Sequence, residues 1–247
     1  MNLAGLAKEK QAIDNQPDTQ MLKFSVAVVA ITRKLWQIKR FLLGELGVKI
    51  LCLTGGLASG KSTATQFLER QGAMVIDADK LGHRAYDTGT QAYLQVIETF
   101  GTYIVDDEHR IDRKVLGSKV FGQPAALKKL TDIVWPEIRR LAELEIAGFD
   151  AAYPDGLVVL EAAVLFEAGW DDIGDEVWAV VADRETAIGR AMARDGFARE
   201  AVEQRLDAQL SNDERRSRAD VVIDNSGLLS DMQAQLIEQW KRLSDAK

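Results

Sequence analysis

One short segment limits the fold of this chain more than any other: an apolar run, a glycine-rich turn and a helix-favouring stretch in succession. The apolar run covers residues 48–53, the turn is Gly55-Gly-Leu-Ala-Ser-Gly-Lys-Ser62, and the helix is expected at about 61–71. The turn matches the phosphate-loop pattern G-x-x-x-x-G-K-[ST], which is meaningful only between a strand and a helix. Because the sequence supplies both flanks, we predict a strand–loop–helix unit that binds phosphate groups.

Each residue type in this turn has a physical reason. Glycine at positions 55, 56 and 60 allows backbone conformations closed to other residues, so that N–H groups can surround an anion. The helix that follows adds the positive end of its dipole. We expect Lys61 to reach the β- and γ-phosphates of ATP and the Ser62 hydroxyl to ligate Mg²⁺. The predicted nucleotide-binding residues of the loop are Gly55, Gly56, Leu57, Ala58, Ser59, Gly60, Lys61, Ser62 and Thr63.

The rest of the chain alternates short apolar segments with helical ones. Further strands are expected at 74–76, 157–160, 177–181 and 221–223, and helices at about 113–121, 124–148, 184–195, 199–210 and 229–243. The strands are almost wholly apolar, as expected when both faces of a sheet are covered. Strand–helix alternation predicts an α/β fold with a doubly wound parallel sheet, of the P-loop NTPase type. We assign 48–247 to this domain, with a helical substrate-binding region at about 85–150 and a lid at about 184–215.

Composition narrows the classes of function. The chain has 247 residues and a net charge of −7, and 47% of its residues are hydrophobic. An acidic chain is a poor general binder of nucleic acid, because a phosphate backbone requires a basic surface. No apolar run reaches the roughly 18 residues of a membrane span, and the one cysteine, Cys52, is interpreted as a buried strand residue rather than a reactive thiol. We therefore expect a cytoplasmic monomer without a nucleic-acid partner.

Residues 1–47 differ from the rest of the chain and are assigned to an N-terminal extension. Basic residues dominate 21–47, and apolar residues recur there at helical spacing at Leu35, Ile38, Leu42 and Leu46. A basic amphipathic helix of this kind suits weak contact with a membrane surface or a partner protein. Packing against the main domain explains the same pattern, and the sequence leaves both interpretations open.

The acids after the second predicted strand indicate which kind of phosphate-loop protein this is. The guanine-reading motif N-K-x-D of GTPases is missing, whereas Asp77-Ala-Asp79 occurs where a kinase of small molecules places an acid facing the phosphates. An Asp there can orient and deprotonate an acceptor hydroxyl. We favour Asp79 as the base and expect both acids to contact the acceptor. Capping of the next helix would suit an Asp equally well.

Three further charged residues are candidates for the site. Arg190 and Arg194 are spaced i, i+4, so both project from one face of a helix and could clamp a polyphosphate. A solvated helix face paired with Asp183 or Asp195 explains them equally well. Glu161 follows an apolar strand and could hold water around Mg²⁺, or serve as a helix cap.

Several motifs together resemble those of the dephospho-coenzyme A kinase family. They are Leu53-Thr-Gly-Gly-Leu-Ala-Ser-Gly-Lys-Ser-Thr63, Val75-Ile-Asp-Ala-Asp79, Ile111-Asp-Arg113, Val164-Leu-Phe-Glu167, Arg190-Ala-Met-Ala-Arg194 and Ala219-Asp-Val-Val-Ile-Asp-Asn225. Two segments, Leu81-Gly-His-Arg-Ala-Tyr86 and Thr131-Asp-Ile-Val-Trp-Pro136, are similar to the kinase half of the animal bifunctional coenzyme A synthase. These motifs cover residues 48–243 in the order found in the family.

The resemblance implies transfer of the γ-phosphate of ATP to the ribose 3′-hydroxyl of dephospho-coenzyme A. It implies Mg²⁺-ATP as the donor, Asp79 as the base, and Lys61, Arg190 and Arg194 as the residues that neutralise phosphoryl charge. His83 and Arg113 are implied at the acceptor and Asn225 near the adenine. The resemblance also makes an adenylyltransferase a candidate partner for residues 21–47.

The chain departs from the family pattern in two places. Trp135-Pro136 stands where the family usually has His-Pro, and Glu108-His109-Arg110 stands in a turn where glycine is common. The second departure bears on Arg113, which follows that turn. Two alternatives to the implied activity stay open: a kinase of another nucleoside or small alcohol, and a nucleotide-sensing module without catalysis.

Overall fold

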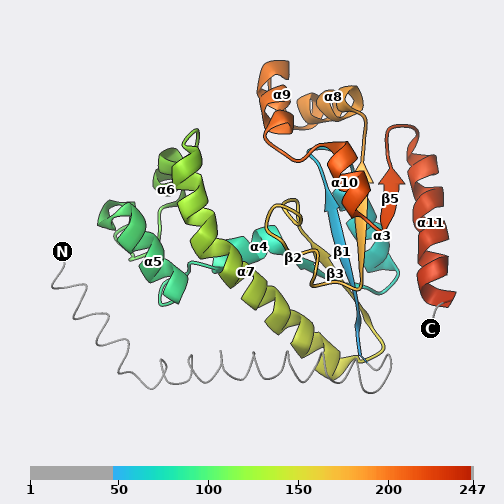
Figure 1. Cartoon of the computed structure of the whole chain (residues 1–247), viewed down its shortest axis with the longest axis horizontal. Helices are drawn as coiled ribbons and strands as arrows, with labels where there is room; N and C mark the ends of the chain where they lie inside the picture. The colour runs from blue at the N-terminus through green and yellow to red at the C-terminus, as the bar shows by residue number, and fades with distance from the viewer. Residues whose placement is uncertain (1–46, 246–247) are drawn as a thin grey trace. The chain divides into compact units, whose positions relative to one another are not determined.

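The computed structural model describes residues 47–245, and Figure 1 labels their elements. The chain divides into two compact units. The first, here called the sheet unit, comprises Val48–Asp79 and the chain from Tyr153 onward, and the second, the helical unit, comprises Lys80–Ala152. The extension predicted at 1–47 lies outside the described residues, apart from Gly47. No helix within 47–245 is both long enough and apolar enough to span a membrane.

Within 47–245, the sheet unit carries five strands: β1 (Lys49–Gly55), β2 (Met74–Asp77), β3 (Leu157–Glu161), β4 (Glu176–Val181) and β5 (Val221–Asp224). Their order across the sheet is β2-β3-β1-β4-β5, and every pairing is parallel. The apolar runs of the sequence become strands because their side chains are buried on both faces of the sheet. The predicted α/β fold with a parallel, doubly wound sheet is confirmed.

The helices of the sheet unit are α3 (Lys61–Arg70), α8 (Arg184–Asp195), α9 (Arg199–Asp207), α10 (Asn212–Arg218) and α11 (Leu229–Asp245). Helices α3 and α11 cover one face of the sheet (Figure 1). Their buried residues, which include Leu68 and Leu236, pack against side chains of β1, β3, β4 and β5 such as Leu53 and Trp178. This packed core fixes the strand ends, from which the loops of the candidate site begin.

The helical unit contains α5 (Gln91–Phe100), the short 3₁₀ helix η1 (Thr102–Ile104), α6 (Arg113–Val120) and α7 (Pro124–Ala152). Helix α4 (Ala78–Arg84) begins at the end of the first segment of the sheet unit and continues into the helical unit. Helix α7 is longer than the predicted 124–148, and Pro136 lies inside it. Helices α5 and α6 both contact α7. No residue range was predicted for three of the helices, α4, α5 and α10. Helix α4 is the next helix that the capping alternative for Asp77 or Asp79 required.

The turn before α6 explains one departure from the family pattern. His109 has a φ of 61°, the left-handed conformation that glycine adopts at no steric cost. Asp106 stabilises the turn, because its Oδ1 accepts the N–H groups of Glu108 and Arg110 at 3.0 and 2.8 Å. The hydrogen bond from the Arg110 backbone lowers the pKa of Asp106. The turn therefore forms without glycine, and α6 begins at Arg113 after an Asp112 cap.

Candidate active site

The candidate site lies at the carboxyl ends of three neighbouring strands. Glu161, the last residue of β3, is opposite Leu53 of β1 on one side and opposite Asp77 of β2 on the other. In parallel α/β sheets, ligands bind outside the carboxyl ends of the strands. The phosphate loop that leaves β1 therefore shares one edge of the sheet with both acids.

Glycine is required at two positions of the loop for steric reasons. At Gly60 φ is 101°, and a Cβ atom there would lie 2.1 Å from Nδ2 of Asn225. At Gly55 a Cβ atom would lie 2.6 Å from the backbone oxygen of Val180. Ala58 also takes a left-handed conformation, with a φ of 53°. The loop is thus packed too closely against its surroundings to accept larger residues at positions 55 and 60.

The loop leaves a set of N–H donors available. The Ser59 and Thr63 N–H groups bond to the carbonyl oxygens of Gly56 and Gly60 at 3.2 and 2.9 Å. Helix α3 begins after Gly60 with no side-chain cap. No described residue accepts a hydrogen bond from the N–H groups of Ala58, Gly60, Lys61 and Ser62. Free N–H groups at a helix start form an anion-binding site.

Lys61 of α3 forms an ion pair with an acid at the end of β3. Its Nζ lies 2.6 Å from Oε1 of Glu161, and both side chains are mostly buried. The other carboxylate oxygen of Glu161 accepts the hydroxyl of Thr65 at 2.5 Å. Glu161 and Lys61 are predicted from the sequence separately, and Thr65 is not predicted. Its position four residues after Lys61 nevertheless places it on the same face of α3.

Asp77 at the end of β2 and Asp79 after it have different roles in the local structure. Oδ1 of Asp77 accepts the Asp79 N–H at 2.9 Å, so Asp77 caps the start of α4. Asp79 lies in the first turn of α4, and its side chain is exposed. Of the two acids, Asp79 is therefore the one exposed to solvent.

Asn225 and Arg190 are fixed next to the phosphate loop, whereas Arg194 is not. Asn225, only 5% exposed, donates from Nδ2 to the Ser59 carbonyl at 2.8 Å. The backbone carbonyl oxygen of Asn225 accepts a hydrogen bond from Nη1 of Arg190 at 2.8 Å. Arg194 is exposed and bonds to Asp195, a contact that raises the pKa of Arg194. Of the two arginines, Arg190 thus contacts Asn225 beside the loop. Arg194 pairs with Asp195, as the alternative interpretation of these residues expected.

The implied acceptor residues of the helical unit also lie close to each other. Nη2 of Arg113 donates to the His83 carbonyl at 2.7 Å, and the guanidinium lies 5.8 Å from the centre of the Tyr86 ring. Both His83 and Arg113 are exposed. The structure therefore places these two residues side by side on one surface of the helical unit.

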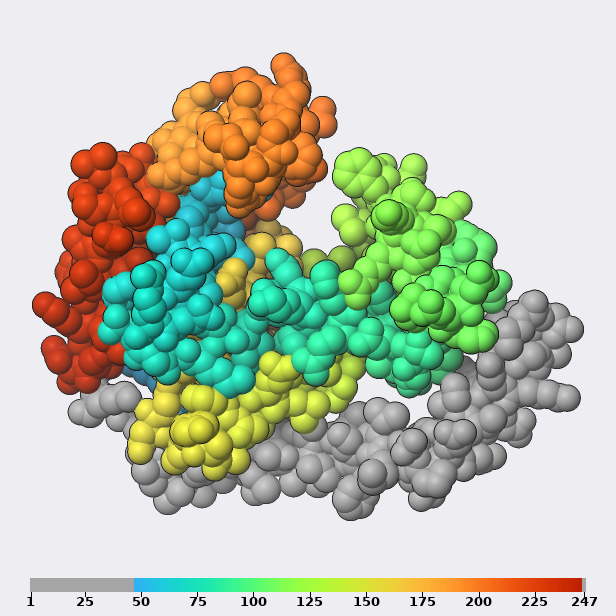
Figure 2. Space-filling model, turned by 180° about the vertical axis from the view of Figure 1, so that it is seen from behind, coloured from blue at the N-terminus to red at the C-terminus, as the bar shows by residue number. Residues whose placement is uncertain are grey.

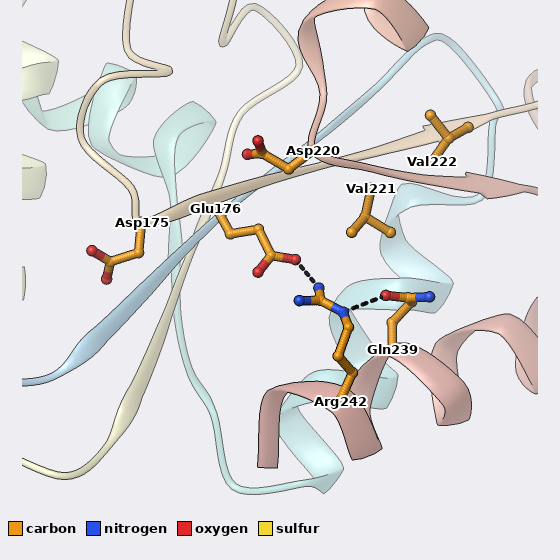
Figure 3. A pocket seen from close by; sticks show the side chains of 7 residues that line it. All are labelled: Asp175, Glu176, Asp220, Val221, Val222, Gln239 and Arg242. Atoms are coloured by element: carbon orange, nitrogen blue, oxygen red, sulfur yellow. Dashed lines mark hydrogen bonds and ion pairs between the residues drawn. The ribbon is translucent and has the colours of Figure 1, made fainter. Parts of the chain in front are cut away.

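A separate polar cavity lies at the opposite edge of the sheet, at the start of β4 and β5 (Figure 3). Its acids are used by the fold: Asp175 accepts the Ile50 N–H at 2.8 Å, and Asp220 accepts the Val177 N–H at 2.7 Å. Arg242 of α11 bonds to Glu176 and Gln239 there. These contacts pair strand ends with neighbouring segments, and none of the predicted site residues lines the cavity.

A parallel five-stranded sheet whose first strand enters a phosphate loop, with acids at the adjacent strand ends, defines the class of P-loop kinases. A family model described as dephospho-CoA kinase matches residues 49–231. The chain belongs to the dephospho-CoA kinase family.

Individual relatives agree with this assignment. The dephospho-CoA kinase of Geobacter sulfurreducens is 46% identical over 195 residues, which are 79% of this chain and 98% of the relative. That of Carboxydothermus hydrogenoformans is 38% identical over 79% of this chain and 96% of its own length. Among solved structures, the dephospho-CoA kinase of Campylobacter jejuni is 28% identical, with a TM-score of 0.60 over 80% of this chain and 98% of that chain.

Proposed function

We propose that this protein transfers the γ-phosphate of ATP to the ribose 3′-hydroxyl of dephospho-coenzyme A, giving coenzyme A and ADP. Membership of the dephospho-CoA kinase family supports the reaction. The observation that carries the chemistry is the single sheet edge at which the phosphate loop, Glu161 and Asp77 follow adjacent strands. Such an edge supplies a phosphate cradle and an acid for the acceptor hydroxyl together.

Nucleotide binding falls to residues 55–63. In our proposal the free N–H groups of Gly60, Lys61 and Ser62 surround the β-phosphate, and Asn225 borders the adenine. Lys61 exchanges Glu161 for phosphate oxygens when the nucleotide binds. The Lys61–Glu161 ion pair supports this role, since it holds the ammonium group at the edge of the loop. Among the described residues, Glu161 is the one partner that the ammonium group would have to exchange.

The residues present suit Mg²⁺, which prefers oxygen ligands and is commonly held by few protein groups together with substrate phosphates. Ser62 is exposed in the first turn of α3 and offers a hydroxyl, and Glu161 offers a carboxylate for metal-bound water. When bound, the ion would neutralise charge on the phosphates. Ser62 and Glu161 would hold and orient it.

Proton transfer from the acceptor is assigned to Asp79. Its side chain is exposed, and its backbone is fixed to Asp77 by the 2.9 Å hydrogen bond. A carboxylate held at that strand end can orient the 3′-hydroxyl for in-line attack and accept its proton. Asp77 contributes by fixing the start of α4.

We assign acceptor binding to the helical unit, Lys80–Ala152, which corresponds to the region expected at about 85–150. Arg113 and His83 lie together there, and the Arg113 guanidinium matches the pyrophosphate of the acceptor. The segment from α8 to α10 corresponds to the lid expected at about 184–215, with Arg190 and Arg194 neutralising phosphoryl charge. A cytoplasmic location is proposed because a single cysteine suits a reducing compartment.

The test measures ADP release from Mg²⁺-ATP with and without dephospho-coenzyme A, with the product identified by mass. Coenzyme A is the matched control acceptor, because its 3′-hydroxyl already carries phosphate. We expect strong stimulation by dephospho-coenzyme A and none by coenzyme A. Equal stimulation by adenosine or a shikimate-like alcohol would indicate a different kinase. ATP binding without stimulation by any acceptor would indicate a nucleotide-sensing module.

A further inference from the structure

Four buried polar side-chain atoms lack a hydrogen-bond partner among the described residues, and all four lie in or beside the phosphate loop. They are Thr54 Oγ1, Ser59 Oγ, Arg215 Nη2 and Asn225 Oδ1. Buried polar groups are nearly always satisfied, so a cluster of exceptions needs a reason. Unsatisfied groups that concentrate at one place are typical of a functional site, where function outweighs local stability.

Arg215 is the most costly member of this cluster. It lies in α10 and is only 2% exposed. Its Nη1 donates to the Leu210 carbonyl, and no carboxylate of the described residues forms an ion pair with it. Burial lowers the pKa of Arg215, and the charges of Glu167 and Glu214 oppose that shift. A guanidinium nevertheless stays protonated in a protein, so Arg215 is a buried positive charge without a paired anion.

The position of this charge links it to the nucleotide. Nη1 of Arg215 lies 3.4 Å from the point where a Cβ atom of Gly56 would stand. The guanidinium therefore lies against the backbone of the phosphate loop at Gly56. A side chain at this position would occupy the space next to the guanidinium. An anion bound in the loop would add to the charges of Glu167 and Glu214 and act as a counter-ion for Arg215.

Gln209, six residues earlier, fixes the next residue of the loop. Its Oε1 accepts the Leu57 N–H at 2.9 Å. The side chains of Leu57 and Ala58 pack against a small apolar cluster of α8 and α9, formed by Ile188, Ala191 and Val202. In Figure 2 these two helices, in orange, stand next to the blue segment that begins the sheet unit. The loop is thus held both by side-chain packing and by the hydrogen bond that the Leu57 N–H donates to Gln209, which follows α9.

We propose that Arg215 and Gln209 are positioning residues for the nucleotide, which act through the backbone of Gly56 and Leu57. Gln209 keeps the loop in the conformation whose N–H groups are free for phosphate. Arg215 supports the same backbone and adds positive charge behind the polyphosphate, which serves as its counter-ion. This inference rests on the proposed use of ATP and not on the identity of the acceptor.

If Arg215 only stabilised the fold, its replacement would lower the melting temperature of the nucleotide-free protein. The proposed role predicts a loss of ATP binding instead. An unpaired buried charge is costly, and replacing buried ionic groups by apolar residues of similar volume is often neutral or stabilising. Arg215→Met should therefore leave the melting temperature of the nucleotide-free protein within a few degrees of wild type. The same change should weaken binding of Mg²⁺-ATP about tenfold and that of Mg²⁺-ADP less, because ADP carries less negative charge.

The experiment measures dissociation constants for both nucleotides by calorimetry without any acceptor, so that failure of the proposed acceptor would not affect it. Arg218→Met is the matched control, since Arg218 lies in the same helix but is exposed and pairs with Asp171. It should leave both constants unchanged. Arg215→Lys keeps the charge and should recover part of the loss. A folded Arg215→Met variant that binds ATP as wild type does would overturn the proposal.

Gln209 gives a second test, which holds even if Arg215→Met fails to fold. Gln209→Leu removes the acceptor for the Leu57 N–H at nearly constant volume and should weaken Mg²⁺-ATP binding about three- to tenfold. Gln204→Leu, at an exposed position of α9, is the control and should have no effect. Unchanged ATP affinity in Gln209→Leu, or equal losses in the two leucine variants, would refute positioning of the loop by Gln209.

Discussion

The sheet unit and the helical unit hold their candidate residues in different ways. In the sheet unit, Gly60 is packed against buried Asn225, and Lys61 is bound to Glu161, so each group has a fixed neighbour. In the helical unit, His83 and Arg113 are exposed and joined by one hydrogen bond to a backbone carbonyl. Phe121 is 88% exposed on the same unit.

This difference reflects what each unit is proposed to recognise. A triphosphate presents the same oxygens in every phosphate-loop protein, so a preorganised backbone is sufficient to bind it. An acceptor is distinguished by its own shape and charges, which require exposed side chains. We therefore expect mutations in the sheet unit to change ATP binding or turnover, and mutations in the helical unit to change acceptor affinity alone.

The largest effect is expected at Asp79. Asp79→Asn keeps the size of the side chain but removes the group that accepts the proton, so kcat should fall by roughly 10²- to 10⁴-fold. The dissociation constant for ATP should stay within about twofold of wild type. Steady-state kinetics with calorimetric ATP binding would measure both quantities.

Asp77→Asn is the matched comparison for this variant. Asparagine retains an oxygen that can accept the Asp79 N–H, so the cap of α4 is preserved and the loss in kcat should be much smaller. A larger loss in Asp77→Asn than in Asp79→Asn would move the catalytic base to Asp77. An unchanged kcat in both would leave the strand end without a base.

Gly60→Ala should cause the next largest effect. Its Cβ atom would lie 2.1 Å from Nδ2 of Asn225, and alanine is disfavoured at a φ of 101° by about 1–2 kcal/mol. With loss of the Asn225–Ser59 bond, at about 1 kcal/mol, the total cost of about 2–3 kcal/mol should weaken ATP binding about 30- to 100-fold.

Gly72→Ala separates backbone strain from the close contact. Gly72 has a φ of 93° but nothing within 4 Å of its Cβ position, because it follows the exposed end of α3. The variant should lose stability and keep its affinity for ATP. Equal losses of affinity in the two variants would show that the loop depends on general stability rather than on the Asn225 contact.

The sequence predicted the strands and the phosphate loop better than the short helices, for physical reasons. Apolar runs such as 177–181 are specific for buried parallel strands, and the glycine-lysine pattern is tied to one backbone shape. Helix α10 was missed because Asn212–Arg218 has no apolar stripe, although the capping box of Ser211 and Glu214 signals its start. Helix α5 also had a signal, in the Thr90 cap and the Gly101 end.

The candidate site shows the same limit. The phosphate loop, Glu161 and Asp79 follow strands, so their common position could be inferred from the order of elements alone. The contacts of Gln209 and Arg215 could not, because they depend on how the segment after α9 packs on Leu57 and Gly56. A buried arginine has no pattern in sequence that distinguishes it from the exposed Arg216 and Arg218 beside it.

Arg113 offers the smallest and most selective effect. Its guanidinium is held by the His83 carbonyl at 2.7 Å and is proposed to bind phosphate of the acceptor. Arg113→Gln removes this charge and should raise the KM for dephospho-coenzyme A about tenfold, with the ATP constant unchanged, because an exposed charge-assisted contact contributes about 1–2 kcal/mol. Lys114→Gln, one residue along the exposed surface of α6, removes the same charge and should leave that KM within about twofold. A loss of ATP affinity in Arg113→Gln would break the division between the two units, and equal changes in KM for the two variants would reduce Arg113 to a general charge effect.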